Sequence, residues 1–172
     1  MESRANLTCF CALIALSLIA SRLCTAARVG PARSDPTQQA QAAISASLAA
    51  ARNVSFTVSD MAKSGGLKPR EAAAVKDCMV TVRASVDELQ RSLRALKGAA
   101  AADGGKRAVV VDQMKDVQTW VSAALTDETT CMDGFADGGM DGGVKETIRD
   151  QIVKVARLIS NALALVGDLC NN

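Results

Sequence analysis

The stretch VQTWVSAALTDETTCMDGF, residues 117–135, contains both a helical repeat and the point where that helix stops. Apolar residues recur at three- and four-residue steps, which places them on one side of an α-helix. This apolar face comprises Val110, Met114, Val117, Val121 and Leu125. Cys131 follows, and a glycine-rich loop runs from Gly134 to Gly143. The stretch therefore predicts an amphipathic helix that begins near Lys106 and carries a cysteine at its end.

Three other segments show the same repeat, so the predicted fold is all-α. The first apolar face, from about Gln38, comprises Ile44, Leu48, Ala51, Val54 or Ser55, Val58 and Met61. The second, from Pro69, comprises Val75, Cys78, Val82, Val86, Leu89, Leu93 and Leu96. The last comprises Ile148, Ile152, Val155, Ile159, Ala162, Val166 and Leu169. Short connections between helices of similar length favour antiparallel neighbours. We therefore predict an up-down-up-down antiparallel four-helix bundle over residues 38–170.

The composition agrees with closely packed helices. Hydrophobic residues make up 49% of the chain, but aromatic residues make up only 2%. Small side chains let helix axes approach, and alanine and leucine are good helix formers. A β-sandwich would require more valine, threonine and aromatic residues.

The first residues predict secretion. Arg4 precedes an apolar run over residues 7–20, and small residues follow at 24–27, a pattern typical of a signal peptide. The run is shorter than the ~20 residues that cross a bilayer, and no second such run follows. We therefore expect a signal peptide over residues 1–26 and no membrane association after its removal. Residues 27–37 lack an apolar repeat and predict a flexible leader.

Three cysteines would remain after cleavage, namely Cys78, Cys131 and Cys170. An oxidising compartment favours a disulfide, and three pairings are possible. Antiparallel packing brings the start of the second helix, with Cys78, to the end of the third, with Cys131. That pairing is our preference, and the chain-entropy model gives it about 4 kcal/mol of stabilisation. Cys170 would then be unpaired, or would form a dimer through an intermolecular bond.

The chain lacks residues and motifs that several classes of function require. The chain has no histidine, which excludes the usual Ser-His-Asp and Cys-His sites, and it has no CxxC zinc motif or nucleotide-binding glycine motif. The formal net charge of +2 argues against nucleic acid as a partner. We interpret Asp87-Glu88, Asp127-Glu128 and the loop residues Asp133, Asp137 and Asp141 as solvated charges, because their spacing is unlike that of a calcium loop. We therefore predict no catalytic residue, metal or cofactor, and no enzyme activity.

A glycosylation sequon occupies Asn53-Val54-Ser55. Asn53 lies beside the first apolar face, so a glycan there would project outward. In a secreted chain Asn53 is a candidate for N-glycosylation.

The opening stretch also carries a resemblance. Residues 117–126 and 130–135 resemble the plant pectin methylesterase inhibitor and invertase inhibitor family. Residues 71–78, EAAAVKDC, are similar to the second helix of that family, and residues 159–166 to its last. The resemblance covers about residues 38–170 and implies a cell-wall inhibitor that binds pectin methylesterase as a stoichiometric partner across its substrate cleft. It also implies that Cys78–Cys131 is the second disulfide of the family.

The resemblance points to partner-binding residues on the third helix, because the second and third helices of such inhibitors supply much of the contact. The residues on the solvent side of that helix are Asp116, Thr119, Ser122 and Thr126. An ordinary solvated helix face is the alternative interpretation of these residues. Trp120 flanks the apolar face, and we expect it in the core.

Two alternative functions stay open. An invertase inhibitor would have the same fold and another target, although Trp120 and Asp133-Gly134-Phe135 resemble the pectin methylesterase branch more. A truncated, inactive helical bundle with no enzyme target is the second alternative. The family normally has a helical hairpin with two cysteines before the bundle, and no such cysteine pair lies between the expected cleavage site and residue 38, so we expect the hairpin to be missing here. Lys68 also stands before Pro69 where a capping serine is expected.

Overall fold

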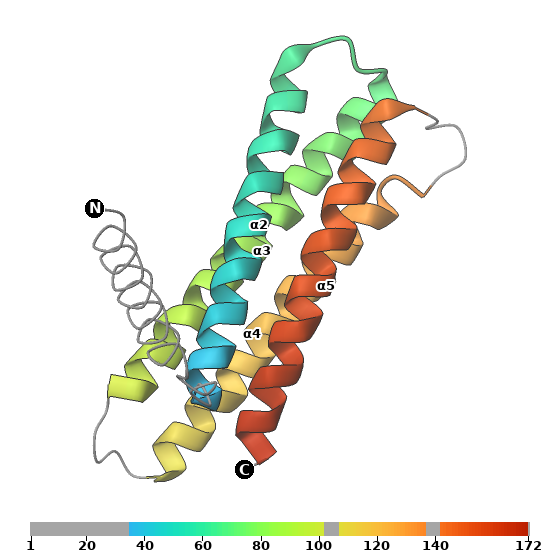
Figure 1. The fold of residues 1–172 in the computed structure, drawn as a ribbon. Helices are drawn as coiled ribbons and strands as arrows, with labels where there is room; N and C mark the ends of the chain where they lie inside the picture. Colours follow the sequence, from blue (N-terminus) through green and yellow to red (C-terminus); the bar gives the residue numbers. More distant parts are fainter. Residues whose placement is uncertain (1–34, 102–106, 137–141, 172) are drawn as a thin grey trace, which may run out of the picture. The chain divides into compact units, whose positions relative to one another are not determined.

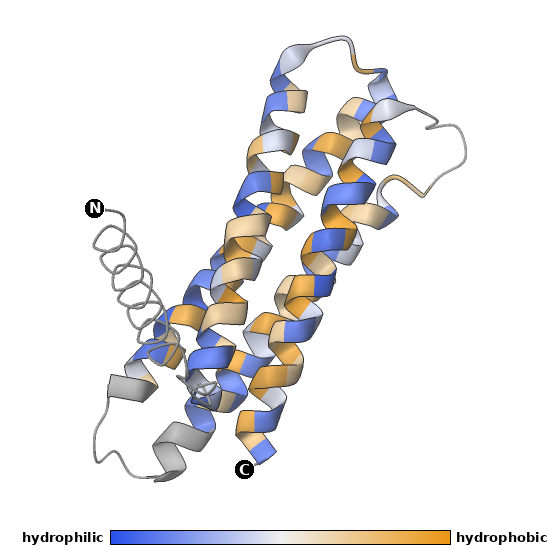
Figure 2. Cartoon of the chain, in the orientation of Figure 1, coloured by the Kyte–Doolittle hydropathy of each residue, from blue (hydrophilic) through white to orange (hydrophobic). Residues whose placement is uncertain are grey.

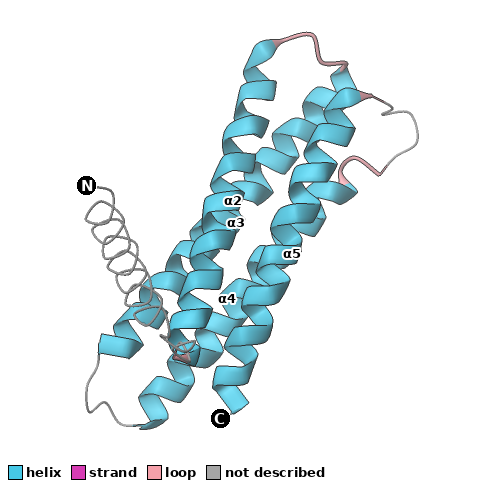
Figure 3. Ribbon diagram, in the orientation of Figure 1, coloured by secondary structure: helices cyan, strands magenta, loops and turns pink. Residues whose placement is uncertain are grey.

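The computed structural model describes residues 35–101, 107–136 and 142–171, which form α-helices and no β-strand (Figure 3). The four helices are α2 (Pro36–Ser64), α3 (Pro69–Ala101), α4 (Arg107–Asp133) and α5 (Gly143–Asn171). All four lie in the compact unit Asp35–Asn172. The expected signal peptide and most of the expected leader lie outside the described residues. None of the described helices is long and apolar enough to cross a membrane.

The helices form an antiparallel bundle in which neighbours in sequence are neighbours in space. Helix α3 packs against α2 and α4, while α5 packs against α2 and α4. In Figure 1 the chain runs up α2, down α3, up α4 and down α5. This arrangement confirms the predicted up-down-up-down four-helix bundle. Helices α2 and α4 lie diagonally opposite each other.

The helix ends differ in detail from the expectation. Helix α2 begins at Pro36, earlier than the expected start near Gln38, and this proline occupies a position in the first turn where its missing N–H costs nothing. Helix α3 continues through Gly98 to Ala101 instead of stopping at that glycine. A glycine inside a helix costs about 1 kcal/mol relative to alanine, which the packing of α3 on both neighbours offsets.

The connection between α2 and α3 turns on two glycines. Gly65 and Gly66 have φ angles of 70° and 80°, a region that other residues avoid. At the start of α3, the Lys68 backbone N–H donates to Oε2 of Glu71 at 2.9 Å. This is one half of a capping box, and it satisfies one backbone donor where the lysine side chain provides no cap.

The core is built from the inward faces of all four helices, and Figure 2 shows apolar positions recurring along each of them. The structure resolves the choice between positions 54 and 55, because Val54 is buried and Ser55 is only half-buried. The predicted residues that are buried are Ile44, Leu48, Ala51, Val54, Val58, Val75, Cys78, Val82, Leu89, Leu96, Met114, Val117, Val121, Ile148, Ile152, Val155, Ile159, Ala162 and Val166. Most of the predicted apolar residues are therefore in the core.

Other predicted core positions lie at its edge. The half-buried ones are Met61, Val86, Leu93, Leu125 and Leu169. Next to two of these positions on α3, Ser85 and Ser92 are buried instead. Ser92 Oγ donates to the Glu88 carbonyl oxygen at 2.9 Å, so its hydroxyl is satisfied within its own helix. The side chain of Val110 lies outside the described residues.

A disulfide joins the start of α3 to the end of α4. Cys78 and Cys131 form it with an S–S distance of 2.00 Å, and both side chains are buried. This confirms the preferred pairing. Among the described residues, Cys170 is the free cysteine and is half-buried. Just beyond the bridge, Phe135 is 1% exposed and closes the core at this end of α4.

Candidate functional site

Helix α4 presents a row of short polar side chains to solvent. Asp116, Thr119, Ser122 and Thr126 are all exposed, as the sequence predicted for a solvent face. Their three- and four-residue spacing keeps them on one side of the helix. At 1.5 Å per residue the row is ~15 Å long. We call these four residues the α4 polar face.

The threonines of the α4 polar face are already ordered by their own helix. Thr119 Oγ1 donates to the Lys115 carbonyl oxygen at 2.9 Å, and Thr126 Oγ1 donates to the Ser122 carbonyl oxygen at 3.2 Å. Each hydroxyl therefore uses its hydrogen internally and keeps its lone pairs as acceptors. The two threonines consequently present hydrogen-bond acceptors in fixed positions on the helix surface.

Two members of the α4 polar face border a groove between α4 and α5. Thr119 and Ser122, together with Gln118 and Leu163, line an open groove of about 350 Å³. A Cβ atom at Gly167 of α5 would lie 3.8 Å from Nε2 of Gln118, which shows how closely that amide approaches α5. Asp116 and Thr126 do not line this groove. The site is thus a helix face with a small cleft on its α5 side.

The opposite side of α4 is anchored in the core. Its buried residues are Met114, Val117, Val121, Ala124, Glu128 and Cys131. The expectation for Trp120 is wrong, because its side chain is half-buried and does not belong to the core cluster. Position 120 follows Val117 by three residues, but it lies at the edge of the apolar face of α4. A large ring at that edge remains partly exposed to water.

The interpretation of Asp127-Glu128 as solvated charges is also wrong for Glu128, which is 0% exposed. Ser85 Oγ of α3 donates to Glu128 Oε1 at 2.8 Å, while Oε2 finds no hydrogen-bond partner among the described residues. Burial raises the pKa of Glu128 from 4.5 to about 7; the Ser85 hydrogen bond opposes this rise, and the charge of Asp127 adds to it.

Two further acidic groups lie near Glu128. Burial raises the pKa of Asp127, and the neighbouring charge of Glu88 raises it further. Glu88 Oε1 lies 3.5 Å from a guanidinium nitrogen of Arg91. Asp87 is exposed, as expected. No group of three acidic or cysteine side chains within the described ranges is arranged to hold a metal ion.

The prediction of solvated loop aspartates can be compared with the structure at one position. Asp133 is exposed at the end of α4, whereas Asp137 and Asp141 lie outside the described residues.

The burial of Glu128 could have been read from spacing. It follows Val121 by seven residues and Ala124 by four, which puts it on the buried face of α4. Ser85 follows Cys78 by seven residues in the same way on α3. Position in the helical repeat thus predicts burial of both residues, although their polar side chains favour solvent.

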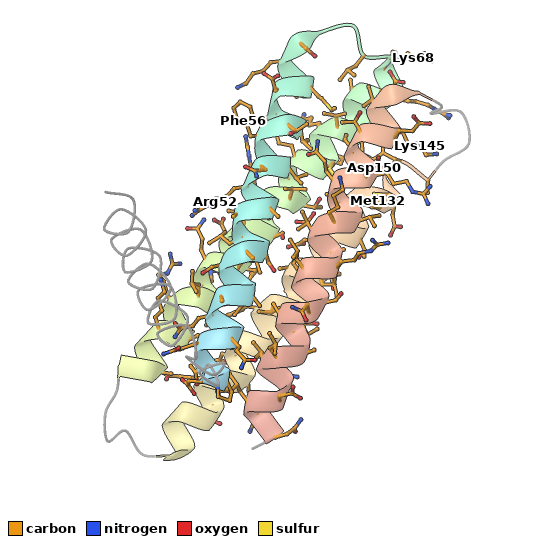
Figure 4. The ribbon with its side chains drawn as sticks, in the orientation of Figure 1. Arg52, Phe56, Lys68, Met132, Lys145 and Asp150 are labelled. Carbon is orange, nitrogen blue, oxygen red and sulfur yellow. A yellow bond between two sulfur atoms is a disulfide. The ribbon has the colours of Figure 1, made fainter. Side chains whose placement is uncertain are left out.

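The sequon lies on the helix diagonally opposite α4. Asn53 is exposed, and its backbone carbonyl oxygen accepts a hydrogen bond from Thr57 Oγ1 at 3.1 Å. Phe56, one turn further along α2, is 75% exposed, and Figure 4 shows it projecting from α2 away from the bundle. A glycan at Asn53 would therefore have room, next to the exposed ring of Phe56.

Comparison with known sequences gives a family match over most of the chain. The family described as plant invertase/pectin methylesterase inhibitor matches residues 17–165. A protein named "21 kDa protein" from Daucus carota is 45% identical over 136 residues, which cover 79% of this chain and 69% of the relative. Pectinesterase inhibitor 9 of Arabidopsis thaliana is 47% identical over 129 residues, covering 74% and 62%. Pectinesterase inhibitor 10 of the same plant is 43% identical over 135 residues, covering 78% and 42%. The chain therefore spans well under the full length of these relatives.

Comparison with solved structures supports the fold. A crystal structure of a pectin methylesterase inhibitor from Arabidopsis thaliana matches with a TM-score of 0.65, covering 79% of each chain. The sequence identity in that match is 17%, so it shows a shared helical architecture and nothing finer.

Proposed function

Because the chain belongs to the plant invertase/pectin methylesterase inhibitor family, we propose that it inhibits pectin methylesterase by forming a stoichiometric complex that covers the substrate cleft of the enzyme. Family membership identifies the matched region as an inhibitor rather than an enzyme. Similar relatives are named pectinesterase inhibitors, which favours pectin methylesterase over invertase as the target.

The α4 polar face is the observation that carries the proposed mechanism. Inhibition by covering a cleft needs no reacting group, only a surface that fits and stays rigid. The α4 polar face consists of short side chains, and the opposite side of the same helix is buried and linked to α3 by a disulfide. A surface of this kind loses little conformational freedom when it binds.

Helix α4 alone is too narrow for a stable complex. A face ~15 Å long on a helix ~10 Å wide presents a few hundred Å² at most, whereas stable complexes bury about 800 Å² per partner. Neighbouring helices must therefore supply the remaining area. The groove bordered by Gln118 and Leu163 makes α5 one contributor, and α3 flanks α4 on its other side.

The test is a titration of purified chain against a plant pectin methylesterase and an acid invertase, with activity measured from pH 4 to pH 7. We expect loss of pectin methylesterase activity at a one-to-one ratio and no loss of invertase activity. Loss of invertase activity alone would identify the alternative target. Loss of neither would make the chain a bundle with no enzyme target.

Two matched variants locate the contact. Ser122→Arg places a large cation in the groove of α4, and Ser45→Arg makes the same change at an exposed position of α2, on the opposite side of the bundle. We expect Ser122→Arg to weaken binding at least tenfold, about 1.4 kcal/mol, and Ser45→Arg to leave it unchanged. Equal binding by both variants would place the contact away from the groove.

We also propose that the protein is secreted to the plant cell wall and carries an N-glycan at Asn53. The apolar run in the first residues and the exposure of Asn53 support this. A glycan on α2 would leave the α4 polar face open to a partner.

A further inference from the structure

Glu128 joins two helices through a buried and incomplete set of hydrogen bonds. Its side chain is fully buried in α4, and its link to Ser85 reaches across to α3, 43 residues away in sequence. Oε1 accepts the Ser85 hydroxyl at 2.8 Å, but Oε2 has no partner among the described residues. A buried carboxylate is stable only when several donors or a cation compensate its charge. One hydroxyl does not meet this requirement, so the ionised form is unfavourable here.

The charges around Glu128 do not supply the missing compensation. Asp127 beside it and Glu88 on α3 are both acidic. The basic residues nearest Ser85 and Glu88 on α3 are Arg83 and Arg91. Arg83 is exposed, and Arg91 is about half exposed, with a guanidinium nitrogen 3.5 Å from Glu88 Oε1. Within this cluster, like charges therefore add to the effect of burial.

The other helices contribute apolar groups. The buried residues of α5, which packs against the other side of α4, are Ile148, Ile152, Val155, Ile159, Ala162 and Val166. The charged residues near the start of α5 are Lys145, which is half-buried, and Glu146, Arg149 and Asp150, which are exposed. Helix α2 buries one polar side chain, Ser47, whose hydroxyl donates to the Ala43 carbonyl oxygen within the helix. None of these buried groups can balance a negative charge on Glu128.

We propose that Glu128 is a proton-dependent tie between α3 and α4, which holds the two helices together when its carboxyl is neutral and weakens their packing when it ionises. The consequence for inhibition rests on the function proposed above, since the α4 polar face belongs to the same helix. Thr126, a member of that face, is two residues from Glu128. Loosening of α4 at this point would therefore disturb the surface offered to the enzyme.

The direction of the pH dependence follows from the raised pKa of Glu128, about 7 in the folded protein against 4.5 without burial. The folded state binds this proton more tightly than the unfolded state. The contribution of Glu128 to stability is therefore greatest below pH 4.5, falls as the pH rises toward 7, and levels off above it. In an acidic cell wall Glu128 would be neutral, and the contact between α3 and α4 would stay intact.

The primary test uses the purified chain alone, with no target enzyme. Urea unfolding is measured from pH 4 to pH 8 for the wild type and for Glu128→Gln, whose amide has the shape of the carboxyl but does not titrate. Relative to this variant, the unfolding constant of the wild type is expected to rise roughly 300-fold over the range. A difference of less than about threefold would overturn the proposal.

A second variant tests the tie from α3 and keeps the proposal open to refutation if Glu128→Gln does not fold. The Ser85 hydroxyl donates to Oε1 and so stabilises the ionised form of Glu128. Ser85→Ala removes this donor. The rise of the unfolding constant with pH should then be about tenfold greater than in the wild type, because the ionised carboxylate loses a hydrogen bond. An unchanged profile would contradict the tie. Asp150→Asn, an exposed carboxyl on α5, is the matched control and should leave the profile unchanged.

Inhibition measurements separate this proposal from the function on which it partly rests. If the unfolding profiles behave as expected but the chain inhibits neither enzyme, the tie stands and the proposed function fails. If the chain inhibits pectin methylesterase but wild type and Glu128→Gln unfold with the same pH dependence, the function stands and the tie fails. If both hold, inhibition by the wild type should decline with rising pH more than inhibition by Glu128→Gln.

Discussion

Removal of the Cys78–Cys131 disulfide should weaken the bundle by an amount that its position determines. The bridge spans a sequence separation of 53 residues. Closing a loop of that length in the unfolded chain gives about 4 kcal/mol of stabilisation on the chain-entropy model. A domain of this size has a total stability of roughly 7–20 kcal/mol, so the double variant Cys78→Ala/Cys131→Ala should still fold. We expect its free energy of unfolding to be lower by about 4 kcal/mol and its Tm by about 15 °C.

The measurement is urea unfolding followed by circular dichroism at a pH where Glu128 is neutral. Cys170→Ala is the control, because this half-buried cysteine lies outside the bridge and should change the free energy of unfolding by less than about 1 kcal/mol. Reduction of the wild type with dithiothreitol removes the bridge without changing a side chain and should give the same loss as the double variant. A loss below about 1 kcal/mol in both experiments would show that the bridge does not restrict the unfolded chain in the expected way.

Three further predictions concern the core and the surface. Ile159→Ala should lower the free energy of unfolding by about 2–5 kcal/mol, whereas Leu158→Ala at the preceding, 37% exposed position should lower it by less than about 1 kcal/mol. Equal losses in urea unfolding would contradict the assigned face of α5. Phe135→Ala should cost about 3–5 kcal/mol, because the ring is 1% exposed beside the bridge, and a cost near zero in the same assay would mean that the ring is not a core residue. In material secreted from plant cells, Asn53→Gln should lower the mass by one glycan without changing inhibition, and an unchanged mass would show that the sequon is empty.

The fold was predictable from sequence because the apolar repeats are long. Each helix spans 27 to 33 residues, so its repeat passes through many turns and excludes a strand. Residue type predicts the buried face of α3 less well. Val86 and Leu93 were expected in the core, but Ser85 and Ser92 are the buried residues on that side of α3. A serine can be buried cheaply when its hydroxyl bonds a carbonyl of the preceding turn, as Ser92 does, and its small volume lets a neighbouring helix approach.

The candidate site was predictable only in part. The α4 polar face follows from the sequence, because it is the side opposite a clear apolar stripe. The groove with Leu163 does not follow, since the register between α4 and α5 depends on packing between segments far apart in the chain. The Ser85–Glu128 contact was missed for the same reason. Periodicity places each residue on a buried face, but only the assembled bundle shows that the two side chains meet.

The position of Glu128 connects stability with the proposed contact surface. Helix α4 is held by a disulfide at one end and by apolar packing along its length, so its outer face is rigid if its inner face is complete. Thr119 and Thr126 add to this rigidity, because their hydroxyls are bonded to the helix before any partner arrives. Long charged side chains would lose up to about 2 kcal/mol of rotamer freedom each on binding, whereas threonine loses much less. Affinity for a partner would then benefit because the side chains of the α4 polar face are already ordered before binding. An ionised Glu128 would weaken the packing of the inner face of α4 and so reduce the rigidity of its outer face. Protonation of this buried carboxyl would therefore affect the α4 polar face without direct contact.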